Sequence, residues 1–144
     1  MMAHRLGAPG RSTVSNPQVL KSTPVLFVET IETSLPFWQE RLGFSRAAEV
    51  LHGDRLGFVI LGNGAVEVMY QSIALLQEDS AAHAGIFHDD KTFLFIEVEN
   101  IDAVVAALTG FEIVMPRRET SYGSIEVGYR EPGGHCVTFA QFKR

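Results

Sequence analysis

The chain has 144 residues, 46% hydrophobic and 20% charged, which suits one compact domain or two small joined halves. Its formal net charge of -5 disfavours a nucleic-acid partner, because phosphate binding needs a basic surface. No apolar run is long enough to cross a bilayer, and the lone Cys136 excludes an internal disulfide. These features predict a cytoplasmic protein in which Cys136 is a small strand residue.

Residues 1–20 differ from the rest of the chain. They contain His4, Arg5 and Arg11 but no acidic residue, and they lack the apolar stretch of a secretory signal. A basic leader is compatible with an organelle transit peptide. Because no amphipathic helix is evident, we expect a flexible N-terminal tail.

The first structural elements are predicted over residues 21–71. A strand at 23–29 precedes a helix that Thr30 or Thr33 can cap, with Pro36 in its first turn. Gly62-Asn63-Gly64 accepts positive φ and predicts a hairpin turn. Three more strands are predicted over residues 44–51, 56–61 and 65–70.

The same order of elements is predicted over residues 91–144. A strand at 92–98 is followed by a helix between Asn100, which can cap it, and Gly110, which can end it. Three strands follow, over residues 111–115, 125–130 and 136–142. Residues 72–90 form a linker, expected to be a short helix or a mobile loop, which carries His83 and His88.

The two halves repeat one another. Val28-Glu29-Thr30-Ile31-Glu32 matches Val98-Glu99-Asn100-Ile101-Asp102 at an offset of 70 residues. The duplication predicts an α+β fold of two βαβββ units. Their curved mixed sheets would enclose a cleft and carry the helices outside.

Two motifs resemble the vicinal oxygen chelate superfamily of glyoxalases, bleomycin-resistance proteins and dioxygenases. Phe37-Trp38 with Leu42-Gly43-Phe44 is similar to the end of the family's first helix. The stretch from Tyr122-Gly123 to Pro132-Gly133-Gly134 is similar to the family's "YGxxEhxxxDPxGN" close. The resemblance covers roughly residues 21–143 and indicates the superfamily, whose members differ in function.

Metal-dependent members of that superfamily hold one divalent ion with residues of the first and last strands of each half. The resemblance places Thr23, Glu67, Phe93 and Thr138 at those positions. Only Glu67 ligates such ions well, whereas a site needs about three good donors. We therefore expect no metal and no cofactor, and we expect His83 and His88 to face solvent.

Strand alternation separates an apolar face from a second face. The second faces are predicted to combine into one concave cleft, in which Glu67 is the residue of greatest interest. Burial would raise the pKa of Glu67, making it a candidate general base or the partner of a cationic ligand group. A carboxylate paired with an arginine or bonded to a threonine is the alternative. The residues expected to bind ligand are Phe27, Trp38, Glu67, Met69, Phe93, Phe95 and Thr138.

Three functions stay open. The first is a metal-independent binding protein, resembling bleomycin-resistance proteins, for a small hydrophobic or aromatic ligand that could carry a positive charge. The second is a lyase or dioxygenase-type enzyme with an unusual metal or none. The third is a ligand-free scaffold, with Phe27, Phe93 and Phe95 filling the cleft. Exposed sheet edges and the family resemblance favour a homodimer, and neither a nucleic acid nor a membrane is expected as partner.

Overall fold

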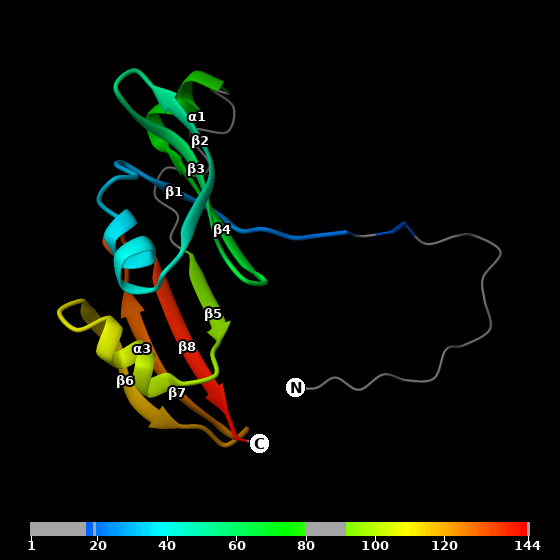
Figure 1. The fold of residues 1–144 in the computed structure, drawn as a ribbon, viewed down its shortest axis with the longest axis vertical. Coiled ribbons are helices and arrows are strands. Elements are labelled where there is room, and N and C mark those ends of the chain that lie inside the picture. Colours follow the sequence, from blue (N-terminus) through cyan, green and yellow to red (C-terminus); the bar gives the residue numbers. More distant parts are fainter. Residues whose placement is uncertain (1–16, 19, 80–91, 144) are drawn as a thin grey trace.

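The computed structural model describes residues 17–18, 20–79 and 92–143. Two four-stranded mixed sheets follow one another along the chain, and they do not close into a barrel (Figure 1). The first sheet contains β1 (Val25–Val28), β2 (Ser45–His52), β3 (Arg55–Asn63) and β4 (Val66–Ser72). The second contains β5 (Phe93–Glu97), β6 (Glu112–Glu119), β7 (Ser124–Arg130) and β8 (Cys136–Phe142).

The strand order is the same in both sheets, which confirms the predicted duplication. It runs β1-β4-β3-β2 in the first and β5-β8-β7-β6 in the second, with the first and last strand of each half paired in parallel. A parallel pair needs a crossover connection, and the segment holding each half's first helix supplies it. The tight turns fall at Gly64 and Gly134, which have φ of 60° and 101°. Gly62 and Asn63, in contrast, do not have positive φ.

The first helix differs from its prediction. It is a single π-helical stretch, η1 (Pro36–Arg41), and it begins after Leu35 with no side-chain cap. Residues 31–34 instead form a turn, in which the Ser34 amide donates to the Ile31 carbonyl. Neither Thr30 nor Thr33 is therefore the cap, because the turn delays the start of the helix.

The second helix agrees with its prediction. It is α3 (Ile101–Ala107), and the Asn100 side chain accepts a hydrogen bond from the Ala103 amide. Asp102 lies in its first turn, where a negative charge is favoured by the helix dipole. Part of the predicted linker is also helical, as α1 (Ile73–Asp79), while His83 and His88 lie outside the described residues.

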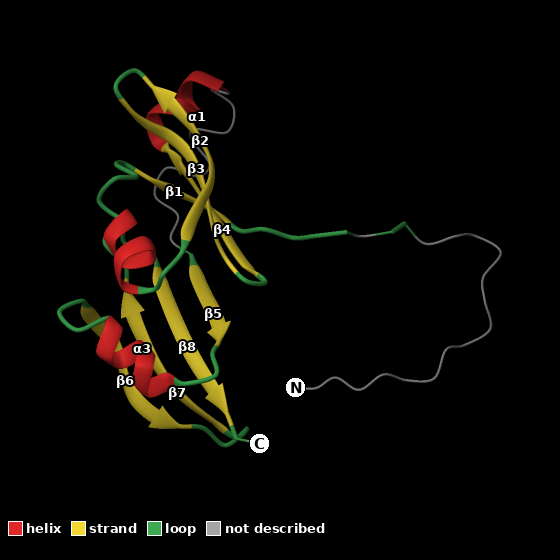
Figure 2. Ribbon diagram, viewed as in Figure 1, coloured by secondary structure: helices red, strands yellow, loops and turns green. Residues whose placement is uncertain are grey.

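One hydrophobic core joins the two halves. The helical segments η1 and α3 lie together on one flank of the molecule (Figure 2). Phe37 of η1 meets Phe111 edge-on at 5.2 Å, and Arg41 donates to the Ala107 and Thr109 carbonyls at the end of α3. The core cluster contains buried residues of both halves, including Leu26, Trp38, Tyr70, Ile101 and Phe139. The helices therefore cover one face of each sheet, and we call the opposite face the open face.

Candidate functional site

Strand alternation places the buried and open faces as predicted. Leu26 and Val28 of β1 are at most 2% exposed, and so are Val137 and Phe139 of β8. The residues that alternate with them along each strand point to the open face. Phe27 of β1 is one of these and is more exposed than its neighbours. Phe93 and Phe95 of β5 are 64% and 49% exposed, so they do not fill a core.

The predicted cleft residues lie on two separate sheets. Val25, Phe27, Glu67 and Met69 belong to the first sheet, and Phe93, Phe95, Glu97 and Thr138 belong to the second. A pocket of about 330 Å³, here called the junction pocket, lies where the two sets meet. It brings Glu67 together with Phe95 and Glu97, while Phe27, Met69, Phe93 and Thr138 are not among its lining residues. The described residues that line it are Ser22, Pro24, Ala65, Val66, Glu67, Val68, Leu94, Phe95, Ile96 and Glu97.

Trp38 lies away from this pocket, in the core. Its side chain is fully buried, packs edge-on against Phe37 and Phe44, and donates from Nε1 to Tyr70 Oη at 2.7 Å. The structure therefore places Trp38 in the packing between the halves, where no ligand reaches it without disrupting the core. The family motif therefore identified a core residue and not a ligand-binding residue, because an indole ring packs as well in a core as in a binding site.

Thr138 is also inaccessible. It is 1% exposed, although it lies on the open face of β8. Gly128 of β7 is its cross-strand neighbour, and a side chain at Gly128 would lie within 3.2 Å of Thr138 Oγ1 and 3.0 Å of Met115 Cβ. Neighbouring side chains thus close over the centre of the second sheet, which alternation along one strand does not reveal.

Glu67 is an ion-paired carboxylate. Its Oε1 lies 2.8 Å from Lys21 Nζ and accepts a hydrogen bond from Thr23 Oγ1 at 3.0 Å. These two hydrogen bonds, from Lys21 first and then from Thr23, lower the pKa of Glu67 more than desolvation raises it. The expected rise in pKa was therefore wrong, and the alternative of a carboxylate bonded to a threonine describes the residue. Its ion-pair partner is Lys21 and not one of the arginines. A lowered pKa makes Glu67 a poor general base near neutral pH.

The four family metal positions do not fit a divalent ion. Phe93 offers no donor atom, Thr138 is buried, and the Thr23 hydroxyl is engaged with Glu67. Within the part of the chain that the structure describes, no group of three or more His, Cys, Asp or Glu side chains is placed to hold a metal. The donors described here therefore do not form the site found in metal-dependent relatives.

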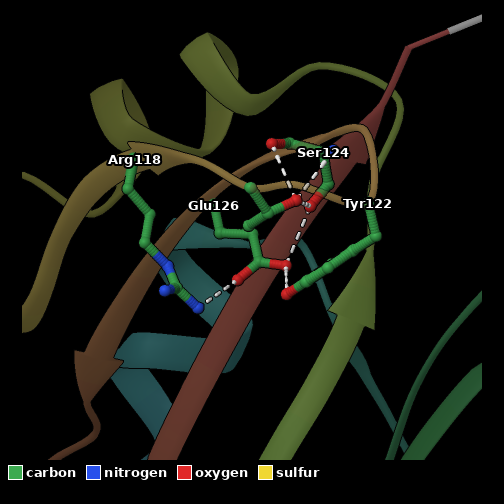
Figure 3. Close-up of polar contacts among 5 residues, drawn as sticks. Arg118, Tyr122, Ser124 and Glu126 are labelled. Atoms are coloured by element: carbon green, nitrogen blue, oxygen red, sulfur yellow. Dashed lines mark hydrogen bonds and ion pairs between the residues drawn. The ribbon is translucent and has the colours of Figure 1, made fainter.

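A polar cluster on the open face of the second sheet was missed by the sequence reasoning. Glu126 is 1% exposed at the centre of β7, and Figure 3 shows Arg118 and Tyr122 reaching it from opposite sides. Arg118 Nη2 donates to Oε1 at 3.2 Å, while Tyr122 Oη and Ser124 Oγ donate to Oε2 at 2.5 and 2.9 Å. The signal that could have found it was the alternation of Ser124 and Glu126 with Ile125 and Val127.

This cluster keeps Glu126 ionised. Burial acts to raise the pKa of Glu126, but the hydrogen bonds from Tyr122, Ser124 and Arg118 and the positive charge of Arg118 outweigh it. The pKa of Glu126 is therefore below its ordinary value. The hydrogen bond between Tyr122 and Glu126 also raises the pKa of Tyr122. Ring contacts from Tyr122 to Phe142 and from Phe142 to Phe95 connect the cluster to the rim of the junction pocket.

A second buried carboxylate links the halves of the molecule. Glu131 accepts hydrogen bonds from Ser34 Oγ and Tyr70 Oη, both at 2.8 Å, and from the His135 amide at 2.7 Å. His135 in turn approaches the Phe27 carbonyl through Nε2 at 3.0 Å. We call Ser34, Trp38, Tyr70, Glu131 and His135 the junction network. Its hydrogen bonds join the first half of the molecule to the second.

The fold and these motifs define the class of protein. A family model described as the Glyoxalase/Bleomycin resistance protein/Dioxygenase superfamily matches residues 20–139. The chain therefore belongs to this superfamily, as the sequence motifs indicated. No curated protein sequence matches it significantly.

Solved structures with the same fold are distant in sequence. TioX from Micromonospora sp. ML1 is 18% identical with a TM-score of 0.68, over 84% of this chain and 97% of that one. A glyoxalase/bleomycin resistance protein/dioxygenase from Nocardioides is 16% identical, with a TM-score of 0.66, and the match covers 90% of this chain and 86% of that one. The bleomycin-binding protein of Streptomyces verticillus, solved with copper(II)-bleomycin, is 23% identical with a TM-score of 0.59. This match covers 89% of this chain and 100% of that one. At these identities the likeness shows the fold alone. No helix in the described residues is long and apolar enough to span a membrane.

Proposed function

We propose that the protein is a metal-independent binding protein for a small hydrophobic or aromatic molecule. The observation that carries the proposal is the junction pocket. Its volume of about 330 Å³ falls at the lower end of the range of about 300–1,000 Å³ common for ligand sites. Its lining is mainly apolar, with the carboxylates of Glu67 and Glu97 as the placed polar groups.

Two further observations support binding over the alternatives. Phe95 lines the pocket while 49% exposed, which leaves a ring face for a ligand and argues against a scaffold with a filled cleft. The ion pair and the lowered pKa of Glu67 argue against its use as a general base. The enzyme alternative then needs another residue to move a proton.

The exposed rings also support a homodimer as part of the proposal. Phe93, Phe95 and Tyr122, at 64%, 49% and 56% exposed, form apolar surface on the second half that a second copy could cover. A mass measured in solution is expected to correspond to two chains. A cytoplasmic location belongs to the same proposal, because the sole cysteine, Cys136, is free.

The binding test uses a panel of planar aromatic compounds, together with copper(II)-bleomycin, titrated by calorimetry. Trp38 fluorescence is a poor reporter, because the ring is buried in the core. A compound that binds wild type is expected to bind Phe95→Ala at least about tenfold more weakly, since burial of a ring against a ligand contributes about 1.5 kcal/mol or more. Ile113→Ala, at an equally exposed apolar residue of β6, is the matched control and leaves affinity unchanged. Equal losses in both variants, or no binding by the panel, would reject the proposed site.

A further inference from the structure

Residues 21–24, which directly precede β1, form one side of the junction pocket, and we call them the wall segment. Ser22 and Pro24 are among the described residues that line the pocket. The backbone of the segment is joined to β4 only at its end, where the Met69 amide donates to the Pro24 carbonyl at 3.0 Å. Among the described residues, no backbone hydrogen bond joins residues 21–23 to β4. The sheet ladder therefore does not hold the rest of the segment in place.

Glu67 of β4 supplies the missing attachment through its side chain. Its Oε1 lies 2.8 Å from Lys21 Nζ and accepts a hydrogen bond from Thr23 Oγ1 at 3.0 Å. Neither Lys21 nor Thr23 is among the described residues that line the pocket, so both contacts hold the segment rather than a ligand. The hydrogen bond from Lys21, followed by that from Thr23, lowers the pKa of Glu67 and keeps its carboxylate ionised near neutral pH.

We infer that Glu67 is a positioning residue, which holds the wall segment against β4 and so fixes one wall of the junction pocket. This role rests on the proposed binding function, because a fixed wall matters only where a ligand packs against it. When Glu67 releases the segment, Ser22 and Pro24 leave the pocket, and a ligand loses part of the surface that buries it. Because an exposed ion pair is weak, the loss of Glu67 changes these equilibria by a few fold rather than by orders of magnitude.

Cleavage by endoproteinase Lys-C after Lys21 measures how often the wall segment detaches, since a protease cuts fastest where the chain has left the folded surface. Each rate in the folded protein is divided by the rate for the same variant unfolded in urea, which removes the effect of local sequence. Glu67→Gln is expected to raise this normalised rate by roughly threefold to fivefold, because the ion pair is lost. Thr23→Val, which removes only the hydroxyl group, is expected to raise it by roughly twofold.

Two further experiments show whether the effect is specific. Glu49→Gln breaks another ion pair of the first sheet, with Arg46 at 2.7 Å, and changes the net charge equally. It is expected to leave the rate of cleavage after Lys21 unchanged. In the Glu67→Ala background, Thr23→Val is expected to lose its effect, because Thr23 acts through Glu67.

The consequence for the pocket is tested with prodan, a neutral naphthalene dye whose fluorescence responds to apolar surroundings. Glu67→Gln and Thr23→Val are both expected to weaken prodan binding by roughly twofold to fivefold, and Glu49→Gln is expected to leave it unchanged. Prodan carries no charge for Glu67 to attract, and Thr23 is not among the described lining residues. A loss in both variants therefore acts through the wall segment.

The outcomes separate this role of Glu67 from the function on which it rests. If Glu67→Gln is cleaved no faster than Glu49→Gln, Glu67 does not hold the segment, and its positioning role is rejected whether or not prodan binds. If cleavage rises while prodan affinity is the same in every variant, the segment is no wall of the site, and the role is rejected while binding stands. If prodan does not bind wild type, the result counts against the proposed function, and the cleavage rates alone decide whether Glu67 holds the segment. Thermal unfolding of each variant confirms that it is folded.

Discussion

Glu126 shows how a single residue can keep a charge in a buried position of a sheet. Three side chains donate to its carboxylate, and Arg118 adds a positive charge from the neighbouring strand. A buried carboxylate is stable only when its oxygens are bonded in this way. The arrangement also fixes Tyr122, whose ring contacts Phe142 beside Phe95. Glu126 is therefore a positioning residue for the open face rather than a ligand contact.

We predict that Glu126→Gln lowers the free energy of unfolding by about 1–3 kcal/mol at neutral pH, because charge-assisted hydrogen bonds are lost. The pKa of Glu126 is lower in the folded than in the unfolded state, so its stabilising effect is full above the unfolded carboxyl pKa. That effect declines as the pH falls through the folded pKa. Chemical denaturation from neutral to acidic pH should show the two proteins converging.

The control for this prediction is Glu119→Gln, at an exposed glutamate of β6 that pairs with Lys143. It should change stability by less than about 0.5 kcal/mol at any pH. A gap between wild type and Glu126→Gln that stays constant with pH would show that packing, not charge, accounts for the loss.

At the scale of elements, the contact between the two halves depends on β4, η1 and the turn before β8. Tyr70 of β4 stands between Trp38 of η1, from which it accepts a hydrogen bond, and Glu131, to which it donates one. Burial, followed by the charge of Glu131, raises the pKa of Tyr70 well above its ordinary value, so the hydroxyl remains a donor. A close approach completes the contact, because a Cβ at Gly133 would lie 2.5 Å from Val28 Cγ1.

We predict that Tyr70→Phe destabilises the protein by about 1–3 kcal/mol, since Glu131 loses a donor and the Trp38 indole loses its acceptor. Tyr129→Phe is the matched control. Tyr129 is equally buried in the second half, but its hydroxyl makes no hydrogen bond with another described residue, so its loss should cost less than about 0.5 kcal/mol. Denaturant unfolding measures both. Similar costs for the two variants would contradict a special role for the junction network.

At the scale of the whole molecule, the two sheets are copies in topology but not in chemistry. The open face of the first sheet is partly buried and mainly apolar at Val25, Phe27 and Met69. The open face of the second carries exposed rings and the Glu126 cluster. The junction pocket lies between unlike surfaces, so each half contributes a different part of the proposed site.

We predict that elemental analysis of the purified protein finds Ni, Zn, Fe and Mn at least about tenfold below one equivalent per chain. The reason is that the positions where metal-dependent relatives hold their ion lack suitable donor atoms here. Added divalent ions should leave the melting temperature unchanged, since ligands that bind only the folded state raise it. One equivalent of metal, or a metal-dependent rise in melting temperature, would overturn the metal-independent proposal and would direct attention to His83 and His88.

The sequence alone determined the duplicated βαβββ topology, the superfamily, and the residues on each face of the strands. These follow from local periodicity and from turn residues, which act over a few positions of chain. It also identified Glu67 as the acid to examine. The prediction was wrong about that residue's pKa, and strand alternation alone did not show that Thr138 is buried. Trp38 was assigned to the site because of its motif.

Only the tertiary structure decided what surrounds those residues. Lys21 is 46 positions from Glu67, and Glu131 is 61 from Tyr70, yet each pair is in contact. The pKa of a carboxylate and the accessibility of a side chain depend on such distant neighbours, which no local pattern contains. The tertiary structure therefore showed that Trp38 belongs to the core, that Glu67 is paired, and that Glu126 is the buried acid of the second sheet.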